Sequence, residues 1–434
     1  MNRKLEMKSL IYLLPLLCSL IVSCDKKKET SENFEFATPE EMGMNADTLA
    51  NIESMVMEFV DAKKFPGAVT LIAKNGKIIY ESEVGWADSL RTIPYRKNHL
   101  FRLASMTKPI VSVATMKLVE SGTINLNDPV SKYISAFDSM EILNDFNPSD
   151  TTWTTTYAEN QPTIHQLLTH TTGISYPSQD RKVYGAIVKK SNLRTGFHED
   201  IGLEEVVNQM ANLPLMHEPG ANWSYGFSTD VLGRVVEVAS GMDLDDYIRE
   251  NITEPIGAET LDFFYCDSSA IRNLTEVFVR NDSGLFRNLP EDFFLEPSFP
   301  VEGAKRFFSG GTGMSGTARD YFLFCQMILN GGNLGETQIL KPATVKLMIQ
   351  DQIDTLTFRN SENRFGYGFE IADAEHPYKP EGSYRWGGAF STEFWIDPGN
   401  DLIVIQMRQM IGSPHSKELN SRLFKTVYNS LPVE

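Results

Sequence analysis

Cysteine, histidine and positive charge are all scarce in this chain of 434 residues. Its 4 Cys and 7 His include no pair with the spacing of a zinc site, and the His-Glu-x-x-His motif is absent, so the sequence predicts no metal site. Lys and Arg total 40 against 57 Asp and Glu, which gives a formal net charge of −17. Because such a surface repels phosphates, nucleic acid is not expected as a partner.

Long apolar runs are also missing, except for one at the N-terminus. Residues 9–23 are apolar and follow Arg3, Lys4 and Lys8, which is typical of a secretory signal peptide and too short for a membrane-spanning helix. The run ends in Ile-Val-Ser-Cys, which resembles the lipobox of bacterial lipoproteins. The resemblance implies that the chain is cut before Cys24, that Cys24 is acylated, and that the exported protein is lipid-anchored in the cell envelope, on its periplasmic or outer face.

Few cysteines remain behind this signal. Cys266 and Cys325 could form one disulfide after export or stay as two buried thiols, and the sequence leaves both alternatives open. Residues 25–38 are polar and charged, and they predict a flexible tether between the anchor and the folded part.

The remaining sequence alternates between helical and strand patterns. Apolar residues recur at intervals of three and four over residues 45–64, which predicts a helix with Asn45 or Asp47 as its N-cap. Two β-rich runs, 68–74 and 77–85, flank Asn75-Gly76 and predict a hairpin. The same reasoning predicts helices at 105–121, 202–212, 229–249 and 416–430, strands at 383–397 and 401–409, and an irregular segment at 136–163.

Helices and strands occur at both ends of the chain, and the middle is mainly helical. This order predicts an α/β domain that carries an inserted helical domain. The predicted organisation is a signal peptide at 1–23, a tether at 24–40, an α/β domain formed by 41–115 and 301–434, and a helical domain at 116–300.

The first candidate for chemistry is the pair Ser105 and Lys108 in the segment Phe101–Pro109. On a helix this spacing places both side chains on one face, so the Lys amine can take the proton that makes a Ser hydroxyl nucleophilic. Taken alone the spacing is weak, because it arises about once or twice by chance in a chain of this length. The alternative is a capped helix with a solvated Lys.

Six segments in order strengthen this interpretation, since together they resemble the serine β-lactamase and penicillin-binding-protein superfamily, and within it the class C β-lactamase-like and esterase branch. The segments are Phe65–Ala68, Phe101–Pro109, Gly122–Val130, His165–Gly173, Pro219–Tyr225 and Gly310–Asp320. The resemblance implies an α+β fold with a mainly antiparallel sheet flanked by helices and an inserted, mostly helical domain. It also implies that Ser105 is the nucleophile.

Tyr225 is the second candidate. The resemblance implies that it shares a proton network with Lys108 and helps to remove the Ser105 proton. The alternative is an ordinary packed Tyr beside Trp223. The family motif continues with Asn two residues later, where this chain has Phe227, so the amide contact to a β-lactam is missing.

The third candidate is the predicted strand around Trp386, Gly387 and Gly388. The resemblance implies that the backbone N–H groups of Ala389 and Ser105 form an oxyanion hole. Trp386 stands where β-lactamases have a Lys that binds the substrate carboxylate, and an indole carries no charge. Together with Phe227, this departure favours a neutral ester with an apolar acyl chain.

The expected activity is therefore that of a serine hydrolase, a carboxylesterase that forms an acyl-enzyme on Ser105 and needs no cofactor. The alternatives are a β-lactamase, a D-amino-acid peptidase or esterase, and a cell-envelope protein that binds a ligand without turnover. The expected partners are a small-molecule ester or amide substrate and the membrane through the lipid anchor, and nothing in the sequence predicts more than a monomer.

Overall fold

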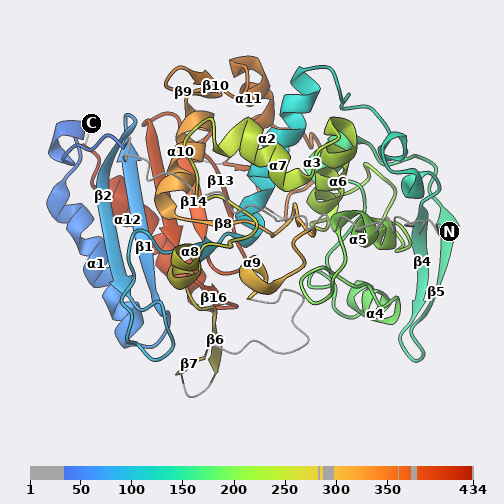
Figure 1. The fold of residues 1–434 in the computed structure, drawn as a ribbon, viewed down its shortest axis with the longest axis horizontal. Helices are drawn as coiled ribbons and strands as arrows, with labels where there is room; N and C mark the ends of the chain where they lie inside the picture. The colour runs from blue at the N-terminus through green and yellow to red at the C-terminus, as the bar shows by residue number, and fades with distance from the viewer. Residues whose placement is uncertain (1–33, 282–283, 287–297, 360, 373–378, 433–434) are drawn as a thin grey trace, which may run out of the picture. The chain divides into compact units, whose positions relative to one another are not determined.

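The computed structural model describes residues 34–281, 284–286, 298–359, 361–372 and 379–432 (Figure 1). The predicted signal peptide, Cys24 and the first part of the tether lie outside the described residues. Within those ranges, no helix combines the length and apolar character needed to cross a membrane.

A seven-stranded sheet forms the centre, in the order β11-β12-β13-β14-β15-β1-β2, and every neighbouring pair is antiparallel. Its strands are β1 (Gly67–Lys74), β2 (Lys77–Gly85), β11 (Arg364–Phe365), β12 (Glu370–Ile371), β13 (Tyr384–Gly387), β14 (Glu393–Asp397) and β15 (Leu402–Met407). The predicted hairpin at Asn75-Gly76 is confirmed, with Lys74 opposite Lys77. β15 pairs with β1, so the two ends of the chain are joined in one sheet.

The predicted strand 383–397 is wrong in its extent. The chain turns back after Gly387, and β13 and β14 pair with each other, with Gly387 opposite Glu393. The reversal uses Gly388, whose N–H bonds to Thr392 O at 2.8 Å, and Ser391, which has a positive φ of 67°. The run 383–397, which the sequence pattern predicts as one strand, therefore forms a hairpin of two strands.

Helices cover both faces of the sheet. α1 (Ala46–Asp61) and α12 (Ser416–Asn429) pack together on one face, where their apolar side chains meet Ile72, Trp395 and Val404. The Asn45 side chain accepts from Thr48 N and caps α1, as predicted. The opposite face meets α10 (Ala318–Leu329), which contacts β1 and β15.

α2 (Thr107–Glu120) lies in the main core and is buried on almost every side, from Thr107 to Met116. It begins with a 3-10 turn, η2 (Ala104–Met106), at the start of the predicted helix 105–121. α2 also packs against α6 (Ser228–Ser240) in the mainly helical part of the chain. It thus connects the sheet with that part (Figure 1).

The middle of the chain is mainly helical. Its α-helices are α3 (Ile164–Thr169), α4 (Tyr184–Lys190), α5 (Leu203–Met210), α6, α7 (Leu244–Ile248), α8 (Ser268–Asn273) and α9 (Phe299–Glu302). The predicted helix 229–249 is divided into α6 and α7, because Gly241 has a φ of 73° and ends α6. The expected α+β organisation is thus confirmed, with helices around a mainly antiparallel sheet.

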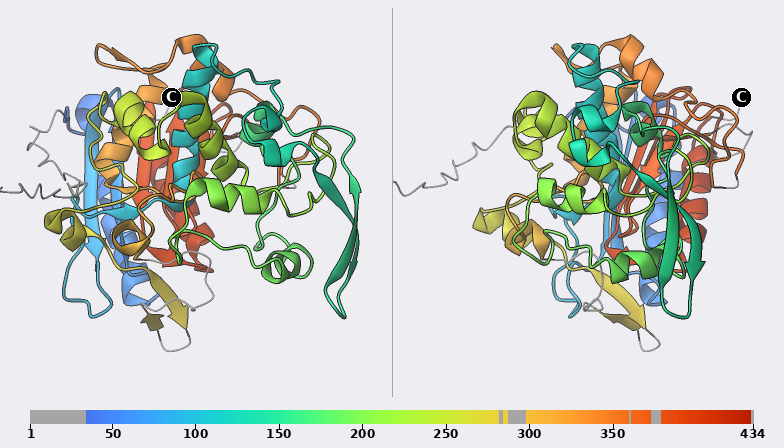
Figure 2. Two further views of the ribbon diagram at one scale, coloured as in Figure 1. Left: turned by 45° about the vertical axis from the view of Figure 1, so that its right-hand side comes forward. Right: turned by 90° about the vertical axis from the view of Figure 1, so that its right-hand side faces the viewer.

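The irregular segment predicted at 136–163 is wrong, because it contains the hairpin β4 (Glu141–Asn147) and β5 (Thr152–Tyr157). Figures 1 and 2 show it at the end of the described body away from α1. Most of its residues are exposed, so no clear apolar alternation marks the strands, and the β-branched Thr residues are the signal that was missed.

Short elements complete the described structure. They are η1 (Glu40–Met42), β3 (Phe101–Arg102), η3 (Val130–Lys132), η4 (Ser135–Phe137), η5 (Arg249–Thr253), β6 (Phe278–Asn281), β7 (Gly284–Phe286), β8 (Ser315–Gly316), β9 (Asn333–Leu334), β10 (Thr337–Gln338), α11 (Pro342–Met348) and β16 (Met410–Ile411). Neither remaining thiol forms a disulfide: Cys325 is buried in α10 and Cys266 is exposed.

Residues 34–38, which the sequence assigns to the tether, are attached to the folded body. Ala37 N bonds to Ile78 O at 3.1 Å, and Ile78 N bonds to Glu35 O at 2.9 Å. The rings of Phe34 and Phe36 lie 5.3 and 5.2 Å from the Arg319 guanidinium. Two aromatic rings in an otherwise polar segment explain why this part is bound and not free.

Candidate active site

Ser105 lies in the turn between β3 and α2. β3 pairs with β8, and Leu103 N donates to Met314 O at 2.9 Å, so the residues before Ser105 are fixed to the segment that leads into α10. Ala104 has a φ of 47°, in the left-handed region that costs a non-glycine residue about 1–2 kcal/mol. Ser105 is 8% exposed. Strain next to a side chain at a helix start is common at functional sites.

Lys108 follows one helical turn later and is almost fully buried. Its Nζ lies 3.4 Å from Ser105 Oγ, 3.1 Å from the Tyr176 hydroxyl and 2.7 Å from Gly311 O. The structure therefore brings Ser105 and Lys108 together as predicted. The three oxygen neighbours satisfy an amine that has no access to water.

Tyr225 lies just before α6, half-buried, with its ring centroid 4.8 Å from Lys108 Nζ. The contact between the two predicted residues is thus with the face of the phenol ring. The hydroxyl that bonds to Lys108 Nζ belongs to Tyr176, whose ring centroid is 5.3 Å from that of Tyr225. Two phenols, one predicted and one not, surround the amine.

Tyr176 is a site residue that the sequence analysis missed. Burial raises its pKa well above the usual value, and the nearby Asp230, to which its hydroxyl is hydrogen-bonded, raises it further. Burial also raises the pKa of Asp230, while the Lys108 charge opposes that rise. The signal was the position of Tyr176, three residues after the matching segment His165–Gly173.

Asp230 is held in place by two further donors. Ser309 Oγ donates to Asp230 Oδ1 at 2.5 Å, and Gly311 N donates to the same oxygen at 3.1 Å. Gly311 thus bonds to Asp230 through its N–H and to Lys108 through its carbonyl. The result is a buried, connected polar network that fixes the position of the Lys108 amine beside Ser105.

The end of β13 approaches the chain before Ser105 very closely. A Cβ on Gly388 would lie 2.2 Å from Leu103 O, so only glycine fits there. Thr392 Oγ1 donates to Leu103 O at 3.1 Å and holds the contact. Ala389 follows in an exposed turn. The oxyanion hole implied by the resemblance would pair the backbone N–H of Ser105, in η2, with that of Ala389 in this turn, and this pairing stays a prediction.

Trp386 is buried in an aromatic cluster beside the two phenols. Its ring centroid lies 5.6 Å from Tyr225 and 5.3 Å from Phe365. The other members of the cluster are His170, Trp223 and Phe358. Burial lowers the pKa of His170 well below its usual value, and the charges of Lys108 and Arg359 lower it further, so this imidazole is neutral.

Phe227 is buried at the start of α6, with its ring 4.5 Å from the Tyr176 ring. It lines a cavity of about 510 Å³ together with Tyr176, Asp230 and Phe307. The structure thus places Phe227 against the phenol that the sequence did not identify. Gly387 ends β13 and is half-buried.

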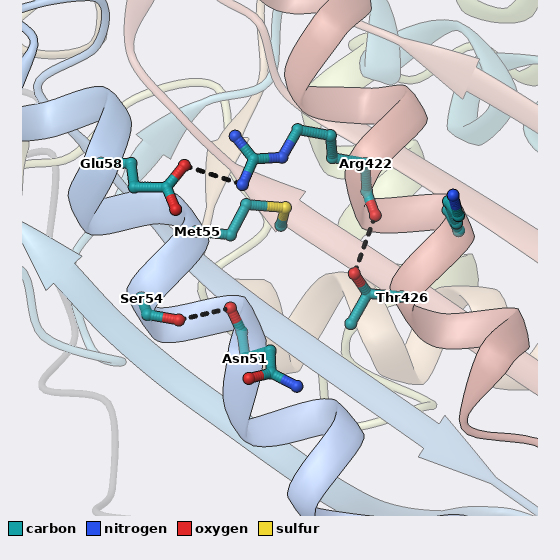
Figure 3. Close-up of a pocket in the computed structure, with 7 residues that line it drawn as sticks. Asn51, Ser54, Met55, Glu58, Arg422 and Thr426 are labelled. Atoms are coloured by element: carbon teal, nitrogen blue, oxygen red, sulfur yellow. Dashed lines mark hydrogen bonds and ion pairs between the residues drawn. The ribbon is translucent and has the colours of Figure 1, made fainter.

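A second cavity, of about 380 Å³, lies between α1 and α12 (Figure 3). An ion pair of 2.7 Å between Glu58 and Arg422 crosses it. Both helices cover the sheet face opposite to α10, and no residue of the network around Lys108 lines this cavity. In the part of the chain that the structure describes, no group of three or more His, Cys, Asp or Glu could hold a metal ion.

Comparisons with known proteins agree with this geometry. The family model described as beta-lactamase matches residues 52–418. An uncharacterised protein of Mycobacterium tuberculosis is 30% identical over 376 residues, covering 82% of this chain and 89% of that protein. Esterase EstB of Burkholderia gladioli is 29% identical over 400 residues, covering 88% of this chain and 96% of EstB.

A solved structure has the same architecture. EstCE1, described as a hydrolase with promiscuous acyltransferase activity, superposes with a TM-score of 0.74 at 25% identity. The match covers 88% of this chain and 99% of EstCE1.

Proposed function

The chain belongs to the beta-lactamase family and has the β-lactamase/transpeptidase-like fold, and on that premise we propose that it is a serine hydrolase acting on carboxylic esters. One observation carries the proposal. The Lys108 amine lies 3.4 Å from Ser105 Oγ and is held there by Tyr176 and Gly311. A hydroxyl beside a positioned amine is an activated nucleophile.

In the proposed reaction, Ser105 Oγ attacks the ester carbonyl carbon while its proton passes to the base formed by Lys108 and Tyr225. The N–H groups of Ser105 and Ala389 stabilise the oxyanion of the tetrahedral adduct. The bond to the alcohol then breaks, and the alcohol leaves with a proton delivered through Tyr225. Water attacks the acyl group on Ser105, which releases the carboxylic acid and returns the proton to Ser105.

The identity of the groups around the site favours esters over β-lactams. Trp386 replaces the charged residue of β-lactamases, and Phe227 replaces the amide donor. The relative EstB is named an esterase, and EstCE1 is described as a hydrolase. β-Lactam or D-amino-acid peptide cleavage is the alternative that a direct comparison of substrates tests.

The test compares p-nitrophenyl esters with a chromogenic cephalosporin, using a soluble chain that begins at residue 34. We expect ester turnover to exceed lactam turnover, and Ser105→Ala to lower kcat for esters by at least 1,000-fold. The matched control is Ser121→Ala at the exposed end of α2, which keeps wild-type turnover. Retention of a tenth of the activity in Ser105→Ala would reject the proposed nucleophile, and faster cephalosporin turnover would reject the ester assignment.

A second candidate is acyl transfer, because EstCE1 is described as having that activity. The same acyl-enzyme serves both reactions, and an alcohol takes the place of water. Adding increasing concentrations of an alcohol to the ester assay distinguishes them. A rise in kcat with formation of the new ester indicates transfer, whereas an unchanged product ratio indicates hydrolysis alone.

We also propose that the protein is a monomeric lipoprotein, exported and anchored in the cell envelope by lipid on Cys24. The support is the positively charged start, the apolar run and the Ile-Val-Ser-Cys sequence. Radiolabelled palmitate should label the wild-type chain in bacteria, and Cys24→Ser should abolish labelling and release the protein from the membrane fraction. Equal labelling of the two chains would reject the proposal.

A further inference from the structure

An arginine from a different part of the chain lies in the aromatic cluster. The guanidinium carbon of Arg359 is 4.9 Å from the Trp386 ring centroid, 5.1 Å from that of Tyr225, and about as far from those of Trp223 and Phe358. Tyr225 is also the ring beneath Lys108 Nζ, at 4.8 Å. The guanidinium and the catalytic amine therefore contact the same aromatic ring.

Arg359 has no ionic partner among the described residues. Glu370 is the carboxylate whose charge acts on it, and Glu370 is already bound by Arg385 at 3.2 Å and by Asn363 at 2.6 Å. The Arg385 charge acts on Arg359 with the opposite sign. Among the described residues, therefore, no carboxylate forms an ion pair with the Arg359 guanidinium, which makes it a candidate to bind an anion.

Arg359 carries the hydrogen-bond donors of this cluster that a bound molecule can use. The indole Nε1 atoms of Trp223 and Trp386 and the Nδ1 of His170 are buried and have no partner in the described structure. The guanidinium of Arg359 has five N–H groups. A carboxylate suits them, because a guanidinium binds a carboxylate with two parallel hydrogen bonds.

The backbone fixes Arg359 in this position. Its φ is 49°, in the left-handed region that is unfavourable for a non-glycine residue, and the preceding Phe358 is buried in the same cluster. The residue as a whole is exposed, although burial of the guanidinium among the rings lowers its pKa. The surrounding packing must maintain this strained backbone, which holds the cation beside four rings.

We propose that Arg359 is the specificity-determining residue of this site, and that the preferred substrate is an ester that carries a carboxylate. The inference rests on the proposed esterase function and names its substrate class. It differs from the neutral ester expected from Trp386, because the charge missing from β13 is supplied by another segment. A local cation is needed since a net charge of −17 repels anions from the molecule as a whole.

Matched ester pairs test the proposal and show where the carboxylate sits. For the acyl side, kcat/KM for mono-p-nitrophenyl glutarate is compared with that for its neutral methyl ester. For the alcohol side, 4-butyryloxybenzoate is compared with its methyl ester. In one pair we expect wild type to prefer the anion, and Arg359→Gln to lower the ratio at least tenfold. Arg359→Lys should keep the ratio to within threefold, since it keeps the charge.

Arg364→Gln is the control, because it removes the same charge from β11, where Arg364 pairs with Asp351 at 3.8 Å. It should leave both ratios unchanged. The proposal is overturned if Arg359→Gln leaves both ratios within twofold of wild type, or lowers the anionic and neutral rates equally, as loss of a purely structural contact would. An equal fall of the ratio in Arg364→Gln would show a general charge effect and also overturn it.

The inference and the esterase function can fail separately. If wild type cleaves these esters through Ser105 without preferring the anion, only the inference fails. If wild type cleaves no ester, the anion site is tested by binding instead, with calorimetry of monomethyl glutarate and of dimethyl glutarate. Tighter binding of the monoester, lost in Arg359→Gln, supports the anion site, and equal or absent binding of the two rejects it.

Discussion

Lys108 is almost fully buried, and its side chain can stay there because oxygen atoms from three separate segments lie around Nζ. The Ser105 oxygen is its neighbour along the helix. The Tyr176 hydroxyl and Gly311 O come from distant parts of the chain. A buried polar atom without such partners costs about 1–3 kcal/mol, so each of them helps to decide where the amine points.

The two phenols should contribute to catalysis to different degrees. Tyr225→Phe removes the proposed proton donor and should lower kcat for esters by at least 100-fold. Tyr176→Phe removes a partner that positions Lys108, and should lower kcat by about tenfold with KM changed less than threefold. Steady-state kinetics on p-nitrophenyl butyrate measures both.

Tyr133→Phe is the control for these two variants, because Tyr133 OH also donates to a carboxylate, that of Asp128 at 2.6 Å, outside the candidate site. Its kcat should match wild type. A larger loss in Tyr176→Phe than in Tyr225→Phe would contradict the assigned roles and make Tyr176 the proton-transferring phenol.

At the level of single elements, β13 depends on the contact between Gly388 and the chain before Ser105. Gly388→Ala would place a Cβ 2.2 Å from Leu103 O, whereas a Cβ on Gly387 would be 3.2 Å from Thr392 O. We expect Gly388→Ala to lower the free energy of unfolding by about 2 kcal/mol and to reduce kcat, since the proposed oxyanion hole would move. Gly387→Ala should cost less than about 1 kcal/mol.

Urea unfolding of the two alanine variants measures this difference. Equal stabilities for Gly388→Ala and Gly387→Ala would show that the strand end can shift without loss, and would reject the close contact as a constraint on the site.

Asp245, in the helix α7, should make the free energy of unfolding depend on pH. Burial and the neighbouring Asp262 raise the pKa of Asp245 to about 8 in the folded chain, against about 3.8 when unfolded. Between these values the native state keeps a proton that the unfolded state has released, so raising the pH favours unfolding. The stabilisation of the folded chain by protonated Asp245 is fully present below about pH 3.8. It is lost as the pH rises through about 8.

We therefore expect the free energy of unfolding to fall between pH 5 and 9, and to fall less in Asp245→Asn, as measured by urea titration at each pH. Asp47→Asn is the control, because it removes an exposed carboxylate from α1 and leaves the surroundings of Asp245 unchanged. Its curve should keep the wild-type slope. A wild-type slope in Asp245→Asn would contradict the raised pKa of Asp245.

At the level of the whole molecule, the two ends of the chain meet in one sheet, where β15 pairs with β1 and Phe36 bridges to Ile78. A chain that begins at residue 39 lacks this bridge and the two Phe rings over Arg319. We expect it to unfold about 2–5 °C below a chain that begins at residue 34, as measured by calorimetry. Equal midpoints would mean that residues 34–38 add nothing to stability.

The sequence by itself determined the features that depend on neighbours along the chain. A spacing of three residues on a helix brings Ser105 and Lys108 together wherever the helix lies. Asn75-Gly76 sets a hairpin because its backbone suits the turn. The periodic apolar side chains of 45–64 predicted α1 to within a few residues. In each case the cause is local geometry.

Only the tertiary structure decided the features that join distant segments. Tyr176, Asp230 and Gly311 surround Lys108 although no periodicity relates them, because their positions depend on how α2, α6 and the loops pack. The position of Arg359 beside the site likewise depends on how distant segments of the chain pack together. The substitution at Trp386 showed that β13 lacks a charge, but only the folded chain shows a guanidinium over that indole, because a charge acts through space and not along the sequence.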